Sequence, residues 1–170
     1  MKKMVFTLAL VLVSAAAMAQ NYIVVNSEKI FKSIPAYNSA IEALDKLAQS
    51  YQEQVDAKFE EVEKLYNAYM QRKATLSEAS QQANEENIIK KEQEATEFQE
   101  SIFGTDGELM KKRLELIQPI QKQVFAAIEE YAKQKGYDMV IDIAQNATML
   151  YYSPKADHTE AIIALLKTKQ

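Results

Sequence analysis

The sequence of 170 residues contains no cysteine, one histidine, three glycines and three prolines. Without cysteine the chain can form neither disulfides nor thiolate metal sites. It also has no glycine-rich phosphate loop and no histidine–carboxylate pattern with metal-ligand spacing. The single histidine, His158, stands beside Asp157 where a helix is expected to begin, and we interpret it as a surface residue rather than a catalytic base. These absences predict a protein that is not an enzyme and needs no cofactor or metal.

The charge balance is acidic, with 24 acidic and 20 basic residues. Segment 36–135 alone holds nineteen acidic and thirteen basic residues, a net charge of −6. Such a surface repels phosphate backbones, so nucleic acid is not an expected partner. One compact basic cluster, Lys111-Lys112-Arg113, interrupts this pattern. It is interpreted either as a solvated helix face or as a partner-binding site.

The first nineteen residues have the pattern of a secretory signal peptide. A pair of lysines precedes an apolar stretch at 5–16, and Ala17 and Ala19 occupy the small-residue positions of a cleavage site, so that Gln20 would begin the mature chain. The apolar stretch is short for a membrane-spanning helix, and the residue after the cleavage site is not the cysteine of a lipid anchor. We expect an exported, soluble protein, with a retained signal anchor as the alternative.

Segment 36–135 carries apolar side chains at the seven-residue spacing typical of helices that pack along a narrow seam. The outgoing half has one eleven-residue step, between Tyr51 and Val62, which predicts a stutter. The two halves, joined by a polar tip at about 77–87, are expected to pair as an antiparallel hairpin, an arm roughly 65 Å long. The predicted seam residues are Leu44, Tyr51, Val62, Tyr69, Leu76, Ile88, Ala95, Ile102, Leu109 and Leu116.

Three residues of the returning half are candidates for a hinge. Gly104 and Gly107 bracket a four-residue stretch inside the seven-residue pattern, and two glycines cost a helix roughly 2 kcal/mol relative to alanine. Pro119 removes one backbone hydrogen bond and is expected to kink the helix. Two interpretations of 104–107 remain open: a weakened but continuous helix that lets the arm bend, or a true break with Gly104 as the helix stop.

The remaining residues, 20–35 and 136–170, predict a small β-rich body. Residues 22–26, 139–143 and 148–152 are β-prone, and the last two are expected to be strands joined by a turn. Three short strands with exposed edges are marginally stable alone, so we expect oligomerisation through this body. Its predicted core residues are Ile23, Val25, Phe31, Val140, Ile141, Met149, Tyr151, Ile162 and Leu166.

Local signals mark the boundaries between the body and the arm. Pro35 is expected to begin the long helix and Gly136 to end the returning one. A helix from about 158 to 167 should close the chain. The expected fold class is therefore α+β, mostly α, with a long antiparallel helical coiled-coil hairpin arm on a small β-rich oligomerisation body.

Three stretches resemble the periplasmic Skp/OmpH chaperones, and their order, with the signal peptide and the intervening hairpin, covers essentially the whole mature chain. They are Val25-Asn26 followed by Ile30-Phe31; residues 138–142; and Tyr151-Tyr152-Ser153 leading to Asp157, Thr159 and the final apolar helix. The resemblance implies a periplasmic homotrimer whose helical arms enclose a cavity. It further implies an ATP-independent holdase that binds unfolded outer-membrane β-barrel proteins, with membrane association at most peripheral.

The arm departs from the family pattern, because the best-known members are strongly basic and this arm is acidic. No lipopolysaccharide-binding residues are therefore carried over. A periplasmic structural spacer or tether, and an envelope-ligand binding module, remain alternative functions. Exposed aromatic residues on the arm would favour the chaperone, and the candidates are Tyr51, Tyr66, Tyr69 and Phe98.

Overall fold

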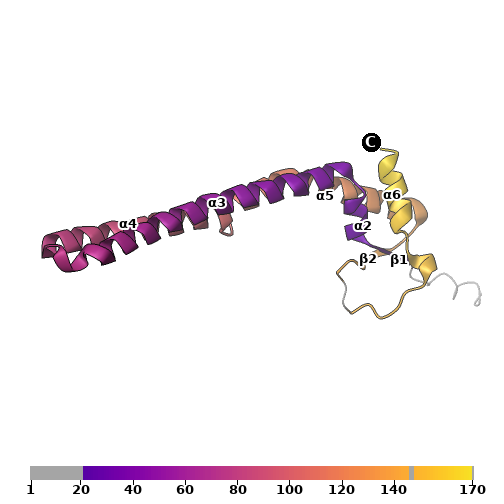
Figure 1. Ribbon diagram of the computed structural model, residues 1–170. Coiled ribbons are helices and arrows are strands. Elements are labelled where there is room, and N and C mark those ends of the chain that lie inside the picture. Colours follow the sequence, from indigo (N-terminus) through magenta and orange to yellow (C-terminus); the bar gives the residue numbers. More distant parts are fainter. Residues whose placement is uncertain (1–20, 146–147, 170) are drawn as a thin grey trace, which may run out of the picture. The chain divides into compact units, whose positions relative to one another are not determined.

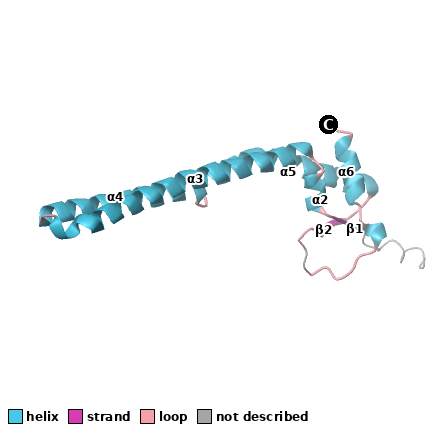
Figure 2. Ribbon diagram, viewed as in Figure 1, coloured by secondary structure: helices cyan, strands magenta, loops and turns pink. Residues whose placement is uncertain are grey.

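The computed structural model describes residues 21–145 and 148–169. The predicted signal peptide and its cleavage residues, Ala17, Ala19 and Gln20, lie outside the described residues. The chain divides into two compact units, one formed by 36–120 and the other by the flanking residues up to Pro35 and from Gln121. Long helices dominate, and the strands are short (Figures 1 and 2). Each unit is described by itself below.

The first unit is a helical hairpin. Helix α3 (Pro35–Arg72) leads to the short 3₁₀ turn η2 (Lys73–Thr75), and α4 (Glu78–Phe103) and the first part of α5 (Glu108–Lys135) return beside α3 (Figure 1). Proline at its first position begins α3, as predicted. Three cross-helix contacts place the two sides in antiparallel register about the turn: Tyr69 with Glu85, Glu61 with Lys91, and Lys58 with Phe98.

The predicted tip at 77–87 is wrong in extent, because α4 begins at Glu78. Ser77 is the N-cap of that helix, and its hydroxyl accepts a hydrogen bond from the backbone N–H of Ser80. The Ser, Gln, Asn and Glu side chains that suggested a loop instead form the solvated face of a helix. The turn itself occupies only 73–77.

The seam of α3 is an uninterrupted heptad pattern, so the predicted stutter is wrong. Less exposed residues alternate at steps of three and four along this stretch, and the positions between them are exposed. A heptad contributes two rows of seam residues, each with a spacing of seven, and we call each row a heptad track. Tyr51 belongs to one track and Val62 to the other. The apparent eleven-residue step arose because Lys58, the next member of the first track, is charged and was not recognised as a seam residue. The seam positions are Ala48, Tyr51, Val55, Lys58, Val62, Leu65 and Tyr69.

On the returning side, α4 continues the same pattern, with Ala95 and Ile102 buried and Ile88 half-buried. Beyond α4 the predicted seven-residue count fails: Leu116 is 37% exposed, whereas Ile117 is 7% exposed. Counting in sevens across 104–107 assumed a continuous helix, but those four residues are not helical. The buried face of α5 therefore begins one position later, at Ile117, and Leu109 is half-buried.

The second unit is the body, built on a two-stranded parallel sheet. Strand β1 (Tyr22–Val25) pairs with β2 (Met139–Asp142), with Ile23 opposite Val140. The other side of β1 is occupied by a bridge between Val24 and Asp157. Three of its four residues are buried, and because successive side chains of a strand point to opposite faces, both faces of β1 are covered.

Helices α2 (Ser27–Lys32) and α6 (Thr159–Lys167), the short 3₁₀ turn η3 (Pro154–Ala156) and the last part of α5 complete the body. Gly136 ends α5 with a φ of 72°, a left-handed conformation that favours glycine, as predicted. The buried apolar residues of this unit are Ile23, Val24, Val25, Ile30, Ile34, Val124, Ala127, Ile162, Ile163 and Leu166.

The predicted strand at 148–152 is absent from the structure. These residues follow an irregular path, and Leu150 and Tyr151 are almost fully exposed. The outer side of β2 pairs with no strand among the described residues, and 148–152 does not form the expected hairpin with it. In the part of the body that the structure describes there are therefore two strands rather than three.

Candidate functional site

The predicted seam residues separate into three groups. Leu44, Tyr69, Ala95 and Ile102 are buried, while Tyr51, Val62, Leu76, Ile88 and Leu109 are half-buried. Leu116 alone among them is exposed. Of the aromatic residues considered for an exposed arm surface, Tyr69 is buried and Tyr51 and Phe98 are half-buried, whereas Tyr66 is 50% exposed. Tyr66 is thus the candidate that lies clearly outside the seam.

Tyr66 has apolar neighbours that sequence reasoning missed. Met70, one turn further along α3, is 49% exposed, and Ile89 on α4 is 62% exposed. Their exposure could not be read from composition, because it depends on which heptad track faces the partner helix. Together with Tyr69, Lys73, Glu85, Ile88 and Glu92 they line a surface hollow of about 460 Å³, which we call the tip hollow.

The wall of the tip hollow is held by a three-residue network. The Tyr69 hydroxyl donates a hydrogen bond to the Glu85 carboxylate, and Lys73 Nζ lies 3.1 Å from the same carboxylate oxygen and 5.2 Å from the centre of the Tyr69 ring. Hydrogen bonds from Tyr69 and then Lys73 hold the pKa of Glu85 below its usual value. Glu85 thus carries a negative charge that is already paired with Lys73 of the same hairpin.

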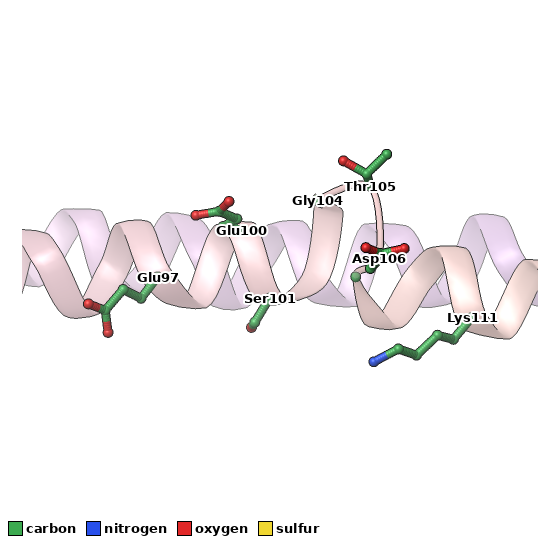
Figure 3. A pocket seen from close by; sticks show the side chains of 8 residues that line it. Glu97, Glu100, Ser101, Gly104, Thr105, Asp106 and Lys111 are labelled. Atoms are coloured by element: carbon green, nitrogen blue, oxygen red, sulfur yellow. The ribbon is translucent and has the colours of Figure 1, made fainter.

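A second hollow surrounds the break in the returning side. Gly104 leaves the helical path, and Gly107 accepts a hydrogen bond from Lys111 N–H as α5 starts; Figure 3 shows Thr105 at the outermost point of this loop. A Cβ on Gly104 would overlap the carbonyl of Glu100, and one on Gly107 that of Ile102. Of the two interpretations of 104–107, the structure has the true break.

Pro119 lies inside α5, where the helix continues through it. Whether any of the three predicted hinge residues permits bending stays a prediction. The hollow at the break has a volume of about 480 Å³ and is lined by Glu97, Glu100, Ser101, Gly104, Thr105, Asp106, Gly107 and Lys111. Its lining is mainly polar, unlike that of the tip hollow.

The body also exposes apolar side chains. Tyr22 and Met139 are about half exposed, and with Asp138 and Ile141 they line a hollow of about 310 Å³ beside the sheet. Of the predicted body core, Ile23, Val25, Ile162 and Leu166 are buried within the single chain, and Phe31, Val140, Ile141 and Met149 are half-buried. Tyr151 is 81% exposed. The single chain therefore buries the β1 and α6 members of this set but not Tyr151.

His158 is not the surface residue that the sequence suggested. Its Nδ1 lies 2.8 Å from the Tyr131 hydroxyl and its Nε2 lies 3.4 Å from that of Tyr137, and its ring is half-buried. The two tyrosine rings stack on each other, and both contact the imidazole. Burial, and then the neighbouring Tyr137, raise the pKa of Tyr131. Every hydrogen-bonding position of the ring faces a phenol, which suits a structural role.

Two carboxylates connect distant segments of the body. Asp142, at the end of β2, accepts hydrogen bonds from the Ser27 N–H and hydroxyl and from Ala144 N–H. Burial alone would raise the pKa of Asp142, but these hydrogen bonds outweigh it and hold the pKa below its usual value. Asp157 accepts hydrogen bonds from the N–H and hydroxyl of Thr159, and that hydroxyl in turn accepts one from Asn26 N–H. Burial would raise the pKa of Asp157, but the hydrogen bonds from Thr159 outweigh it and hold that pKa below its usual value.

Within residues 21–145 and 148–169, no group of three or more His, Cys, Asp or Glu side chains is placed to hold a metal ion. None of the helices in this part of the chain combines the length and apolar character that a bilayer crossing requires.

Comparison with known proteins places this architecture in a family. The family model described as "Outer membrane protein (OmpH-like)" matches residues 21–166. The chain belongs to the OmpH-like family. The match includes both the hairpin and the body, so it confirms the resemblance drawn from the three short stretches and the fold class expected from it.

A solved structure supports the same fold for this OmpH-like chain. The crystal structure of a candidate outer membrane chaperone (OmpH-like) from Caulobacter crescentus CB15 superposes with a TM-score of 0.65. The alignment covers 88% of this chain and 85% of that one, at 13% sequence identity. Comparison with curated protein sequences gave no match. The structural likeness concerns the fold, and family membership is the finding that favours a chaperone-type function.

Proposed function

We propose that this OmpH-like protein is an ATP-independent periplasmic holdase that binds unfolded outer-membrane β-barrel proteins between the arms of a homotrimer and prevents their aggregation. Family membership across residues 21–166 is the observation that carries the proposal. The predicted signal peptide, with Ala17, Ala19 and Gln20 at its cleavage site, supports export to the periplasm. No cofactor and no catalytic step belong to this function.

The surface of the arm supports a holdase physically. A client that must later be released is best held by many weak contacts rather than by one deep pocket. Large apolar side chains are exposed along the hairpin at Phe59, Tyr66, Met70, Ile89, Phe103, Met110, Leu114 and Leu116. At ~25 cal/mol per Å², a few hundred Å² of apolar contact contributes several kcal/mol before ordering costs. Several arms would raise the effective concentration of such contacts.

The surface of the body supports assembly. Tyr22, Met139, Leu150 and Tyr151 expose apolar area in the single chain, and contiguous apolar exposure marks interaction surfaces. The outer side of β2 presents backbone groups that a strand of another subunit could pair with. We infer that residues 20–35 and 136–170 carry trimerisation and that arms formed by 36–135 carry client contact.

Light scattering coupled to size exclusion tests the proposal on the protein from Gln20 to Gln170. The protein is measured alone and mixed with a urea-unfolded outer-membrane barrel as the denaturant is diluted. A trimer that keeps the barrel soluble in a discrete complex and ignores a folded control protein is the expected result. A trimer that lets the barrel precipitate would instead favour a spacer, a tether or an envelope-ligand binding module.

A further inference from the structure

Resting on the proposed function, we propose that the tip hollow selects unfolded segments in which a lysine or arginine lies close to a bulky apolar side chain. The hollow combines an apolar floor with a negative rim, and a segment of that composition complements both. The occupant is a polypeptide chain of another protein, held in an extended form.

The apolar part of the argument comes from exposure. Tyr66, Met70 and Ile89 each leave about half or more of their surface to solvent, although they lie on two helices that pack together. The hollow of about 460 Å³ is within the range of about 300–1,000 Å³ that is typical of ligand pockets. A client side chain placed there would cover apolar area on both helices, and this gain is available to any bulky apolar residue.

The electrostatic part comes from the charge of the surrounding helices. The stretch 53–100, which we call the tip half, has twelve acidic and six basic residues, a net charge of −6. The other residues of the hairpin unit, 36–52 and 101–120, have five acidic and four basic residues, a net charge of −1. Within the tip half, residues 60–92 include every residue that lines the hollow and have seven acidic and five basic residues, a net charge of −2, while the adjoining 53–59 and 93–100 add −4. The hollow therefore lies on the acidic half of the hairpin.

Five of the six basic residues of the tip half, all except Arg72, are already engaged with their own neighbours. Lysines 64, 73, 90 and 91 form ion pairs with glutamates of the same hairpin, and Lys58 lies 4.9 Å from the centre of the Phe98 ring. Among the residues that the structure describes, the Glu92 carboxylate on the rim of the hollow has no ion pair or hydrogen bond. An incoming cation therefore finds a carboxylate at Glu92 and a negative field beyond it.

The same charge argues against two other occupants. A phospholipid surface rich in anionic headgroups and a second copy of the acidic tip half would both bring negative charge against negative charge. A client cation beside Tyr66 would in addition gain from the negative face of the phenol ring. Exposed ion pairs contribute little each, so the apolar floor should set most of the affinity and the charge the preference.

Fluorescence anisotropy with three labelled peptides of equal length tests this inference on the chain from Gln20 to Gln170. The first peptide intersperses Leu and Phe with Lys; the second has Glu in place of Lys; the third keeps Lys and has Ser in place of Leu and Phe. We expect clear binding of the first only. Its affinity should fall as salt is raised to about 0.5 M, where the screening length is a few Å.

Matched variants locate the binding. The double variant Met70→Gln, Ile89→Gln keeps good helix formers at exposed positions and should weaken binding of the first peptide about ten-fold, or roughly 1.4 kcal/mol. Glu92→Gln should weaken it about two-fold and reduce the salt dependence. Leu114→Gln is the control, because Leu114 is 53% exposed but lies outside the tip hollow, and it should leave binding unchanged. Circular dichroism verifies that each variant is helical.

Equal binding of the Lys and Glu peptides, or an unchanged affinity in the double variant, would overturn the inference. Two other results would also overturn it: binding of the unaltered protein to phosphatidylglycerol vesicles, or its self-association in light scattering, if the double variant abolishes either one. Each result would assign the hollow to a different occupant. Barrel aggregation is measured with the same proteins. Protection without peptide selectivity rejects the inference and leaves the holdase standing, whereas selectivity without protection rejects the holdase and leaves only a peptide-binding site.

Discussion

Tyr131 and His158 are joined by a 2.8 Å hydrogen bond between the phenol oxygen and Nδ1, although 27 positions separate them in the chain. The contact connects α5 to the residue that precedes α6. The backbone N–H of His158 also donates a hydrogen bond to the backbone carbonyl of Val24 in β1. One residue thus links three elements of the body. Tyr137 approaches the other ring nitrogen at a longer distance, 3.4 Å.

Tyr131→Phe is expected to lower the free energy of unfolding by about 1–2 kcal/mol, because it leaves Nδ1 of a half-buried ring without its hydrogen bond. Tyr137→Phe is the matched control on the same imidazole and should cost less than about 0.5 kcal/mol, since its bond is long. Urea denaturation followed by circular dichroism, at one protein concentration, compares the two. Equal losses would show that the ring packing, and not the shorter bond, is what matters.

Asp142 should make the stability of the body depend on pH in acid. Its pKa in the folded state is lowered, so the stabilisation is fully present above the unfolded-state pKa of about 3.9 and is lost as pH falls through the folded pKa. Asp142→Asn should therefore destabilise the protein at pH 7, and the difference from the unaltered protein should shrink as pH falls towards 3. Ser27→Ala, which removes one donor to Asp142, should show a smaller effect with the same trend. A difference that is constant between pH 7 and 3 would contradict the assignment.

Lys58→Leu is expected to stabilise the hairpin by about 1 kcal/mol, because the lysine occupies a seam position that a leucine would fill with apolar contact. The loss of the contact between Lys58 and the Phe98 ring offsets part of that gain. Lys64→Leu is the control: that side chain is exposed and forms a surface ion pair with Glu60, so little change is expected. Thermal denaturation measures both, and a stabilisation at Lys64 as large as that at Lys58 would contradict an uninterrupted heptad through Lys58.

Gly104→Ala and Gly107→Ala are each expected to destabilise the hairpin by about 1–3 kcal/mol, because the new methyl group would displace backbone at Glu100 or Ile102. The sign is the informative result. In a weakened continuous helix the same substitutions would stabilise by about 1 kcal/mol each. Thr105→Ala, at the exposed outer point of the loop, is the control and should change the melting temperature little.

The sequence alone determined the features that depend on neighbouring residues. Pro35 and Gly136 bound the helical segment because a missing N–H and a left-handed φ are properties of single positions. The seven-residue spacing determined that two long helical stretches pair along a seam, and three short stretches carried enough pattern to indicate the family. These signals are local, so they survive without knowledge of the fold.

Tertiary structure decided which side chains the seam covers and which it leaves exposed. A heptad pattern has two rows of seam residues. The charge at Lys58 hid the continuation of one row, so a stutter was predicted wrongly, and the loop at 104–107 shifted the buried face of α5, so Leu116 was wrongly placed in the seam. The run at 148–152 is β-prone, but a strand exists only where its backbone pairs with another segment, and within the described chain this run pairs with none. Likewise, the tip hollow and the environment of His158 exist only where separate segments meet, and no single stretch of sequence carries that information.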